Sequence, residues 1–244
     1  MRRGLRGRRA NGTPPLLAPA TIFAGALIAS YDHRRKVSLG TGSQVVTWRD
    51  ISRNGNDAIQ GTSAQQPSQG PSGIDFDGTA DNLACSSNGS LASGALLTVG
   101  LRMTPDVTTS TRVPVCKSQS ASGSWSVQTN GTALRMHIGT PGSTFGEVAS
   151  ALTASTERTY VWVYDGDGAT NADKLKLWID GVAQTVSFTG SIPATITATS
   201  DSLVLGMYAD SAQYWDGKIK AAVMANAAAT TAQRTALEAY LGGL

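Results

Sequence analysis

Short runs of β-branched and aromatic residues, each closed by Gly, Asn or Asp, recur along this chain and restrict its fold more than any other feature. Runs of this kind and spacing are typical of antiparallel strands in a two-sheet sandwich. Asn130-Gly131 and Asp180-Gly181 are dipeptides that favour two-residue hairpin turns. We therefore expect an all-β chain with strands at residues 95–103, 112–117, 124–128, 133–138, 157–164, 174–179, 182–188, 202–207 and 217–224.

The length of 244 residues suits one sandwich, since such domains commonly reach about 200–250 residues. No apolar run reaches the roughly 18 residues of a membrane-spanning helix, so we expect no membrane partner. Only 15% of the residues are charged, and this predicts strands with polar but uncharged outer faces. Such faces are common in extracellular and virion β proteins.

Four turn-rich motifs follow one another along the chain. Residues 45–60 read VVTWRDISRNGNDAIQ, and residues 73–83 read GIDFDGTADNL. Residues 175–182 read LKLWIDGV, and SLVLG at residues 202–206 is followed by YWDGKI at residues 214–219. In this order they resemble the W-x-D-x-S-x-N-G-N-x-A, F-D-G-x-x-D-x-L, L-Y-I-D-G-V and L-x-L-G … F-x-G-x-I motifs of the laminin-G-like, concanavalin-A-like jelly-roll superfamily.

The resemblance covers residues 27–241 and implies an antiparallel jelly-roll sandwich. It also implies a range of functions, because this superfamily contains lectins, glycosidases, adhesive modules and virion parts. One short C-terminal helix is expected at residues 231–241. Thr230 and Gln233 form a capping box there, and Leu237, Tyr240 and Leu241 form an apolar stripe.

The first twenty residues carry positive charge and no acid. We expect an extended basic arm at residues 1–20 and a jelly-roll domain at residues 21–244. A secretory signal is the alternative, although cleavage after Ala29-Ser30 would cut residues 27–32, which resemble the first strand of the superfamily. We expect the arm to dock on a protein rather than on nucleic acid, because no aromatic residues are interleaved to stack on bases. The docking residues would be Arg2, Arg3, Arg6, Arg8 and Arg9.

Catalytic patterns are missing from the sequence. Superfamily glycosidases carry paired acids on one strand, whereas Glu147, Glu157 and Glu238 are far apart in this chain. Neither His33 nor His137 lies near a nucleophile motif. We therefore expect no enzymatic activity and no cofactor.

A calcium ion is the one metal that the sequence suggests. Carboxylate and amide oxygens gather in a Gly-containing loop, and calcium prefers such ligands. The alternative is a polar connector before the next strand. The candidate ligands are Asp165, Asp167, Asn171 and Asp173.

Cys85 and Cys116 lie on different expected strands, so a single disulfide is one interpretation and two buried thiols are the other.

Aromatic residues alternate with aliphatic ones in two neighbouring expected strands. If the aliphatic set faces the core, the aromatic set forms an outer contact surface for a glycan or a protein. That surface would contain Trp162, Tyr164 and Trp178, with Tyr214 and Trp215 as a further pair.

Our first functional hypothesis is a non-enzymatic bacteriophage virion protein, such as a capsid decoration protein or a tail or fibre component. The arm would dock on other virion proteins in a homo- or hetero-oligomeric assembly, and the jelly roll would project outward. The alternative is a carbohydrate-binding, lectin-like module, either secreted or serving a phage in host recognition.

Overall fold

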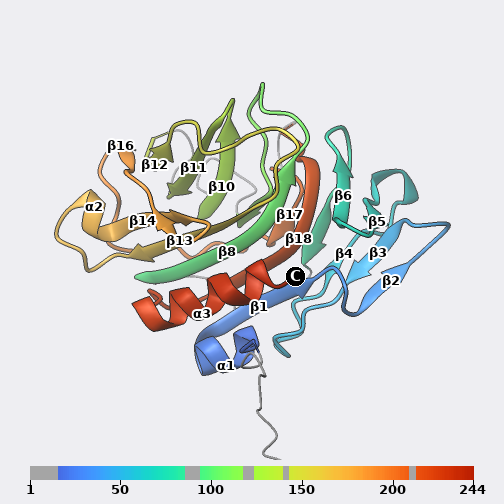
Figure 1. The fold of residues 1–244 in the computed structure, drawn as a ribbon, viewed down its shortest axis with the longest axis horizontal. Coiled ribbons are helices and arrows are strands. Elements are labelled where there is room, and N and C mark those ends of the chain that lie inside the picture. Colours follow the sequence, from blue (N-terminus) through green and yellow to red (C-terminus); the bar gives the residue numbers. More distant parts are fainter. Residues whose placement is uncertain (1–15, 86–93, 118–123, 140–142, 209–212) are drawn as a thin grey trace, which may run out of the picture.

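The computed structural model describes residues 16–85, 94–117, 124–139, 143–208 and 213–244. Two antiparallel sheets stack face to face in it, with a single helix of more than two turns at the C-terminal end of the chain (Figure 1). The predicted all-β, two-sheet sandwich is therefore confirmed. The five arginines of the predicted arm lie outside the described residues.

Sheet A contains the first and the last strand of the described chain side by side. One edge of β18 pairs with β8, and its other edge pairs with β6 along the first half and with β1 along the second half. The strands of sheet A are β1 (Leu27–Asp32), β5 (Ser68–Gly70), β6 (Gly73–Asp77), β8 (Leu96–Pro105), β13 (Arg158–Asp165), β14 (Leu175–Ile179), β15 (Val182–Ala183) and β18 (Asp216–Ala225).

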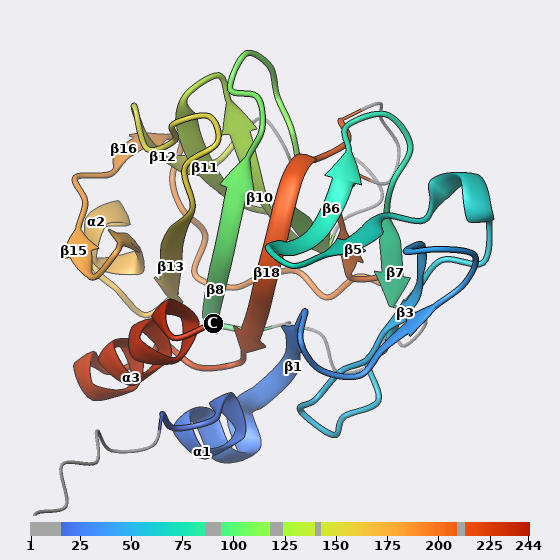
Figure 2. The same ribbon diagram turned by 45° about the vertical axis from the view of Figure 1, so that its right-hand side comes forward.

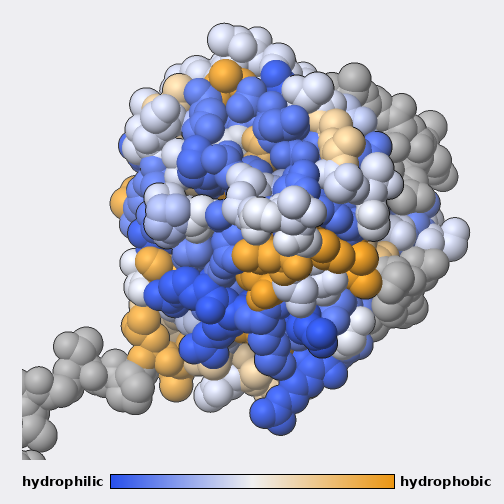
Figure 3. All heavy atoms as spheres, turned by 90° about the vertical axis from the view of Figure 1, so that its right-hand side faces the viewer, coloured by the Kyte–Doolittle hydropathy of each residue, from blue (hydrophilic) through white to orange (hydrophobic). Residues whose placement is uncertain are grey.

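Sheet B has the strand order β16-β12-β11-β10-β9-β17-β7-β4-β3-β2. Its strands are β2 (Val37–Leu39), β3 (Val45–Trp48), β4 (Ala58–Ile59), β7 (Leu83–Cys85), β9 (Val115–Lys117), β10 (Trp125–Asn130), β11 (Ala133–Ile138), β12 (Phe145–Val148), β16 (Ser187–Thr189) and β17 (Val204–Leu205). Figure 3 views the molecule from the β2, β3 and β5 end, where the surface is largely hydrophilic with a hydrophobic band across its middle and smaller hydrophobic areas elsewhere.

The helices lie at the ends of the chain and in loops. The predicted C-terminal helix is α3 (Thr231–Gly242), and both halves of its Thr230 capping box are formed. The helix α1 (Pro19–Phe23) starts inside the predicted arm and packs against α3, with the Leu16 side chain directly over Gly243. The remaining helical turns are η1 (Ala24–Ala26), η2 (Ser63–Gln65) and α2 (Asn171–Lys174). Within the described chain, no helix has the length and hydrophobicity needed to cross a bilayer.

Sheet A is buried on both faces where α3 covers it, and this overturns the predicted aromatic contact surface. Trp162 and Tyr164 are fully buried between the two sheets. The alternating Val161 and Val163 face the other way and pack beneath α3 (Figure 1). The expectation failed because α3 provides a second apolar layer, so the aliphatic residues did not have to face the main core.

The other predicted aromatic contacts are also buried to different degrees. Trp215 is fully buried in the main core, and Tyr214 is half-buried. Trp178 is half-buried at the edge of the α3 layer, with the Arg234 guanidinium 4.6 Å from the centre of its ring. These aromatic residues therefore stabilise the layers and do not form one exposed surface.

The motif at residues 45–60 builds the connection between β1 and sheet B. Both oxygens of the buried Asp50 carboxylate accept hydrogen bonds, from the amides of Ser30 (2.9 Å) and Ser52 (2.8 Å) and from the amide of Asn56 (3.2 Å). The Asn54 and Asn56 side chains each donate to the Ile28 carbonyl at 2.9 Å. These polar residues are therefore structural, because they satisfy the buried backbone of β1.

Cys85 and Cys116 are buried and no disulfide joins them. They lie on β7 and β9, which flank β17, so about 10 Å separates the two backbones. Cys85 faces the main core, whereas Cys116 belongs to a small cluster on the outer face of sheet B. A disulfide needs Cα atoms about 4.4–6.8 Å apart, so the interpretation as two buried thiols is confirmed.

Candidate functional site

The outer face of sheet B carries two rows of side chains, all polar except Phe145, that cross four neighbouring strands. Strand register places Ser126 opposite His137, His137 opposite Phe145, and Phe145 opposite Thr189. The second row lies two residues away on each strand. There Gln128 is opposite Arg135, Arg135 is opposite Glu147, and Glu147 is opposite Ser187. These residues form the outer strip: Ser126, Gln128, Arg135, His137, Phe145, Glu147, Ser187 and Thr189.

The local sequence explains why these side chains share a face. Strands β10, β11 and β12 each alternate core residues with strip residues, as in Leu134-Arg135-Met136-His137. Leu134 and Met136 are fully buried between the sheets, so Arg135 and His137 must point outward. Figures 1 and 2 show β10, β11 and β12 on the opposite side of sheet A from α1 and α3.

An ion pair and an aromatic ring form the middle of the outer strip. The Arg135 guanidinium is paired with the Glu147 carboxylate on the neighbouring strand. The same guanidinium lies 4.5 Å from the centre of the Phe145 ring. The centres of the His137 and Phe145 rings are 4.8 Å apart. The ion pair and the contact with the Phe145 ring hold the Arg135 side chain in place, and the Phe145 and His137 rings limit each other's rotation.

The floor of the outer strip is buried although it belongs to an outward face. Ser126, Gln128 and His137 are 0%, 7% and 2% exposed, respectively. Burial, and secondarily the charge of Arg135, lowers the pKa of His137 to about 4. At neutral pH the imidazole is therefore uncharged, with one nitrogen that donates and one that accepts a hydrogen bond. The floor therefore supports the strip from below, whereas Phe145, Ser187 and Thr189 are among its accessible residues.

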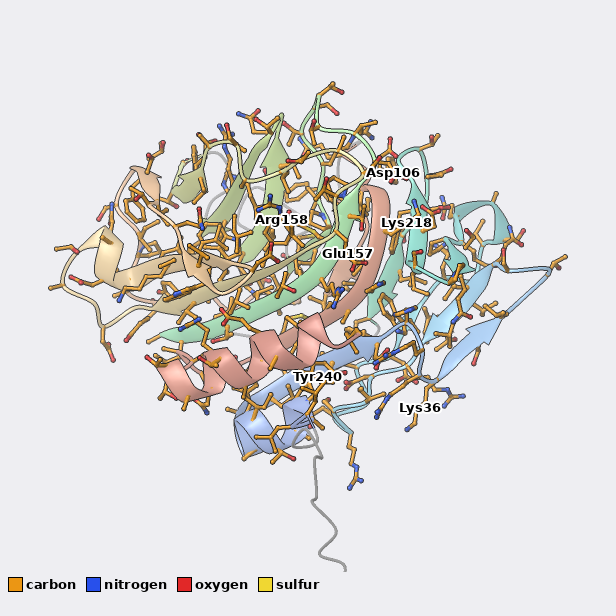
Figure 4. The ribbon with its side chains drawn as sticks, viewed as in Figure 1. Lys36, Asp106, Glu157, Arg158, Lys218 and Tyr240 are labelled. Atoms are coloured by element: carbon orange, nitrogen blue, oxygen red, sulfur yellow. The ribbon has the colours of Figure 1, made fainter. Side chains whose placement is uncertain are left out.

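A second polar surface lies on the outer face of sheet A, beyond α3 (Figure 4). Lys218 Nζ lies 2.9 Å from Asp106 Oδ2 and 3.5 Å from Asp75 Oδ2, and Lys220 Nζ lies 2.8 Å from Glu157 Oε2. The surrounding cavity of about 400 Å³ is lined by Ser72, Thr104, Asp106, Ser155, Glu157 and Lys218.

The charges on this second surface are held in ion pairs. The hydrogen bond to Asp106 is the main cause that raises the pKa of Lys218. Burial opposes ionisation of Glu157, but hydrogen bonds from Lys220 and Arg102 lower its pKa overall. Both groups are therefore held in their charged forms, and the lining residues include no aromatic ring.

The predicted calcium ligands serve the loop itself. Asp173 accepts hydrogen bonds from the amide and hydroxyl of Thr170 in the capping box of α2. The Asn171 side chain donates to the Gly190 carbonyl and accepts from the Ile192 amide, both at 2.9 Å. The Asp165 carboxylate accepts from the Asp167 amide at 3.2 Å. Among the residues that the structure describes, no group of three or more His, Cys, Asp or Glu side chains is placed to hold a metal.

The sequence prediction missed the outer strip as a site. Its signal is a polar or aromatic residue at every second position of three successive short strands, at residues 126 and 128, 135 and 137, and 145 and 147. That signal was weak because residues 145–148 were not predicted to form a strand.

No protein-family model matches the sequence, and no curated protein matches it. Among solved structures, the chain is similar to Trypanosoma rangeli sialidase in complex with sialic acid, with a TM-score of 0.60 and 12% identity. The match covers 90% of this chain but only 33% of the sialidase, so this chain spans about a third of that protein.

A second similar structure is domain 4 of AbnA, a GH43 extracellular arabinanase from Geobacillus stearothermophilus, in complex with arabinotriose. Here the TM-score is 0.53 and the identity 17%, and the match covers 87% of this chain and 98% of that domain. At these identities the likeness establishes the fold, a lectin-like β-sandwich, and nothing further.

Proposed function

We propose that this protein is a non-catalytic carbohydrate-binding module that holds a glycan against the outer strip of sheet B. The observation that carries the proposal is the accessible part of the strip, where the half-buried Phe145 ring lies beside the exposed Thr189 and Ser187. Sugars present hydroxyl groups along their edges and C–H groups on their faces. Neutral donors and acceptors suit the hydroxyl groups, and an aromatic ring suits the C–H face.

The structural neighbours support this choice of ligand class. Domain 4 of AbnA, which matches this chain over nearly its whole length, was solved in complex with arabinotriose. Because the identity is 17%, no residue of that domain is carried over to this chain.

The acids of the outer strip support binding without hydrolysis. Glycosidases commonly need two facing carboxyl groups, one of them protonated. Among the residues that define the outer strip, Glu147 is the one carboxylate, and it is paired with Arg135.

The virion hypothesis remains a prediction, as do the protein partner of the arm and the location of the protein. The arginines on which that hypothesis depends lie outside the described residues, and the neighbours named above give it no support.

A glycan array that includes arabinan oligosaccharides and sialylated glycans tests the proposal, followed by calorimetry with any glycan that binds. Glu147→Gln and Thr189→Ala should weaken binding by about tenfold, since the first removes the charge that positions Arg135 and the second removes an exposed hydroxyl group from the strip. Glu157→Gln is the matched control, because it also removes an Arg-paired glutamate, but on sheet A.

Three results would contradict the proposal. The array would show no bound glycan, or Glu147→Gln and Glu157→Gln would weaken binding equally. Release of reducing sugar from a bound glycan would show that the module is catalytic.

A further inference from the structure

A pocket of about 380 Å³ lies on the outer side of sheet A, between α1, β1 and the loop that follows β3. We call it the Ser30 pocket; its lining includes Thr21, Leu27, Ser30, Arg35, Ile51 and Arg53. Ser30 pairs with Val223, whose side chain belongs to the α3 layer, so Ser30 also points to this outer side. The pocket is therefore separate from the outer strip, which belongs to sheet B.

The floor of the Ser30 pocket contains an unused hydrogen-bonding group. Ser30 is 1% exposed, its amide donates to Asp50 and its carbonyl accepts from the Ile51 amide at 2.8 Å. Its side-chain oxygen, however, has no hydrogen-bond partner among the residues that the structure describes. A buried hydroxyl without a partner is uncommon, since it costs about 1–3 kcal/mol of desolvation. A ligand in the pocket would supply the missing partner.

The rim of the pocket carries excess positive charge. Arg53 is exposed and makes no ion pair with any other described residue. Arg35 lies 3.4 Å from Asp32, but that single carboxylate is shared with Arg34 at 3.3 Å. The nearby Asp50 carboxylate is already engaged by backbone amides. Two arginines therefore line the pocket with little compensating negative charge.

The backbone at Arg53 holds its side chain at this position. Arg53 has a φ of 77°, in the left-handed region that non-glycine residues seldom occupy. The flanking Ser52 and Asn54 side chains are hydrogen-bonded to the Ile28 carbonyl, which fixes the loop on both sides.

We propose that the Ser30 pocket binds a small oxyanion, a carboxylate or a phosphate group, that carries a short apolar body. Arg53 and Arg35 would hold the oxyanion by charge-assisted hydrogen bonds, and the Ser30 hydroxyl would donate to it. Leu27 and Ile51 supply apolar surface for the rest of the ligand.

The probes for this site are butyrate, inorganic phosphate and the neutral analogue butyramide, each titrated into the full chain. Binding is measured by calorimetry and by the shifts of the Ser30 and Arg53 amides in nitrogen-15 NMR spectra. Either anion, or both, should shift these amides, and butyramide should not. Tighter binding of butyrate would identify a carboxylate ligand, and tighter binding of phosphate a phosphorylated one.

Two variants and one control locate the site. Ser30→Ala and Arg53→Gln should each weaken anion binding by about tenfold, because each removes a donor to a charged group. Ser30→Ala breaks no hydrogen bond of the side chain, and Arg53 is exposed, so both chains should fold. Arg49→Gln is the control, since Arg49 is exposed on the same segment but does not line the pocket.

The proposal fails if neither anion shifts the Ser30 and Arg53 amides. It fails equally if butyramide binds as well as butyrate, or if Arg49→Gln weakens binding as much as Arg53→Gln does. None of these outcomes depends on whether a glycan binds the outer strip.

Discussion

His137 is the residue whose environment has the clearest consequence for stability. Its folded-state pKa of about 4 lies below the usual value of about 6.5. Between these two pH values the unfolded chain binds a proton at this residue and the folded chain does not. Stability from this group is therefore complete above pH about 6.5, and acidification toward pH about 4 removes up to about 3 kcal/mol of it.

Replacing this histidine should flatten the acid side of the stability profile. We expect His137→Gln to lose less unfolding free energy than the wild type between pH about 6.5 and about 4, because glutamine does not titrate. Urea unfolding followed by circular dichroism across this range measures the effect. Gln128→Ala perturbs the same strip without removing a titrating group and should keep the wild-type slope. If the unfolding free energy changed equally with pH in His137→Gln and the wild type, folding would not lower the pKa of His137.

At the residue scale, the sequence predicted well wherever a side chain acts on its own neighbourhood. The Thr230 capping box is such a case, because both partners lie within one turn of α3. The direction of Trp162 was wrong because it depends on α3, which is far away in the sequence. Local alternation says that two sets of residues face opposite ways, but it does not say which set faces the main core.

At the scale of elements, the docking of α3 depends on a glycine. Gly100 lies in β8, and a Cβ built on it would lie 2.9 Å from Leu237 Cδ2 and 3.1 Å from Leu241 Cδ1. The two leucines therefore approach the sheet backbone directly, and Gly100 allows this close contact.

Adding a methyl group at this contact should loosen the helix. We expect Gly100→Ala to cost about 1–3 kcal/mol through overpacking, and Leu237→Ala about 2–5 kcal/mol through the cavity it leaves. The double variant should cost less than the two single costs together, because the smaller side chain makes room for the new methyl group. Gly25→Ala is the control: no atom of the described residues lies within 4 Å of a Cβ built there, so its effect should be small. Additive costs for Gly100 and Leu237 would contradict this packing.

Strand prediction at this scale failed where a strand is short or changes sheet. Residues 182–188 were expected to form one strand, but β15 belongs to sheet A and β16 to sheet B. The strand β12 was missed because Gly146 interrupts its pattern. A side chain there would meet Leu175 Cδ2 of sheet A at 2.9 Å, a contact across the core that the local sequence does not reveal.

At the scale of the whole molecule, the two-sheet sandwich was predictable because every strand adds a run of the same kind. The strand order was not, since it depends on pairings between distant segments such as β1 with β18. The outer strip depends on the same pairings, because β10, β11, β12 and β16 must lie in register before its two rows exist.

The pairing of β1 with β18 also brings the two ends of the described chain together, with Leu16 over Gly243. A short Gly/Ser linker could therefore join Leu244 to Leu16, and new ends could be opened at Gly181, in the turn between β14 and β15. Such a circular permutant should keep the parental far-ultraviolet circular dichroism spectrum and nearly the parental urea midpoint, because the cut separates only the edge strand β15 from its neighbour. The order in which the chain connects its strands could then be changed in this protein, whereas the pairing of neighbouring strands could not.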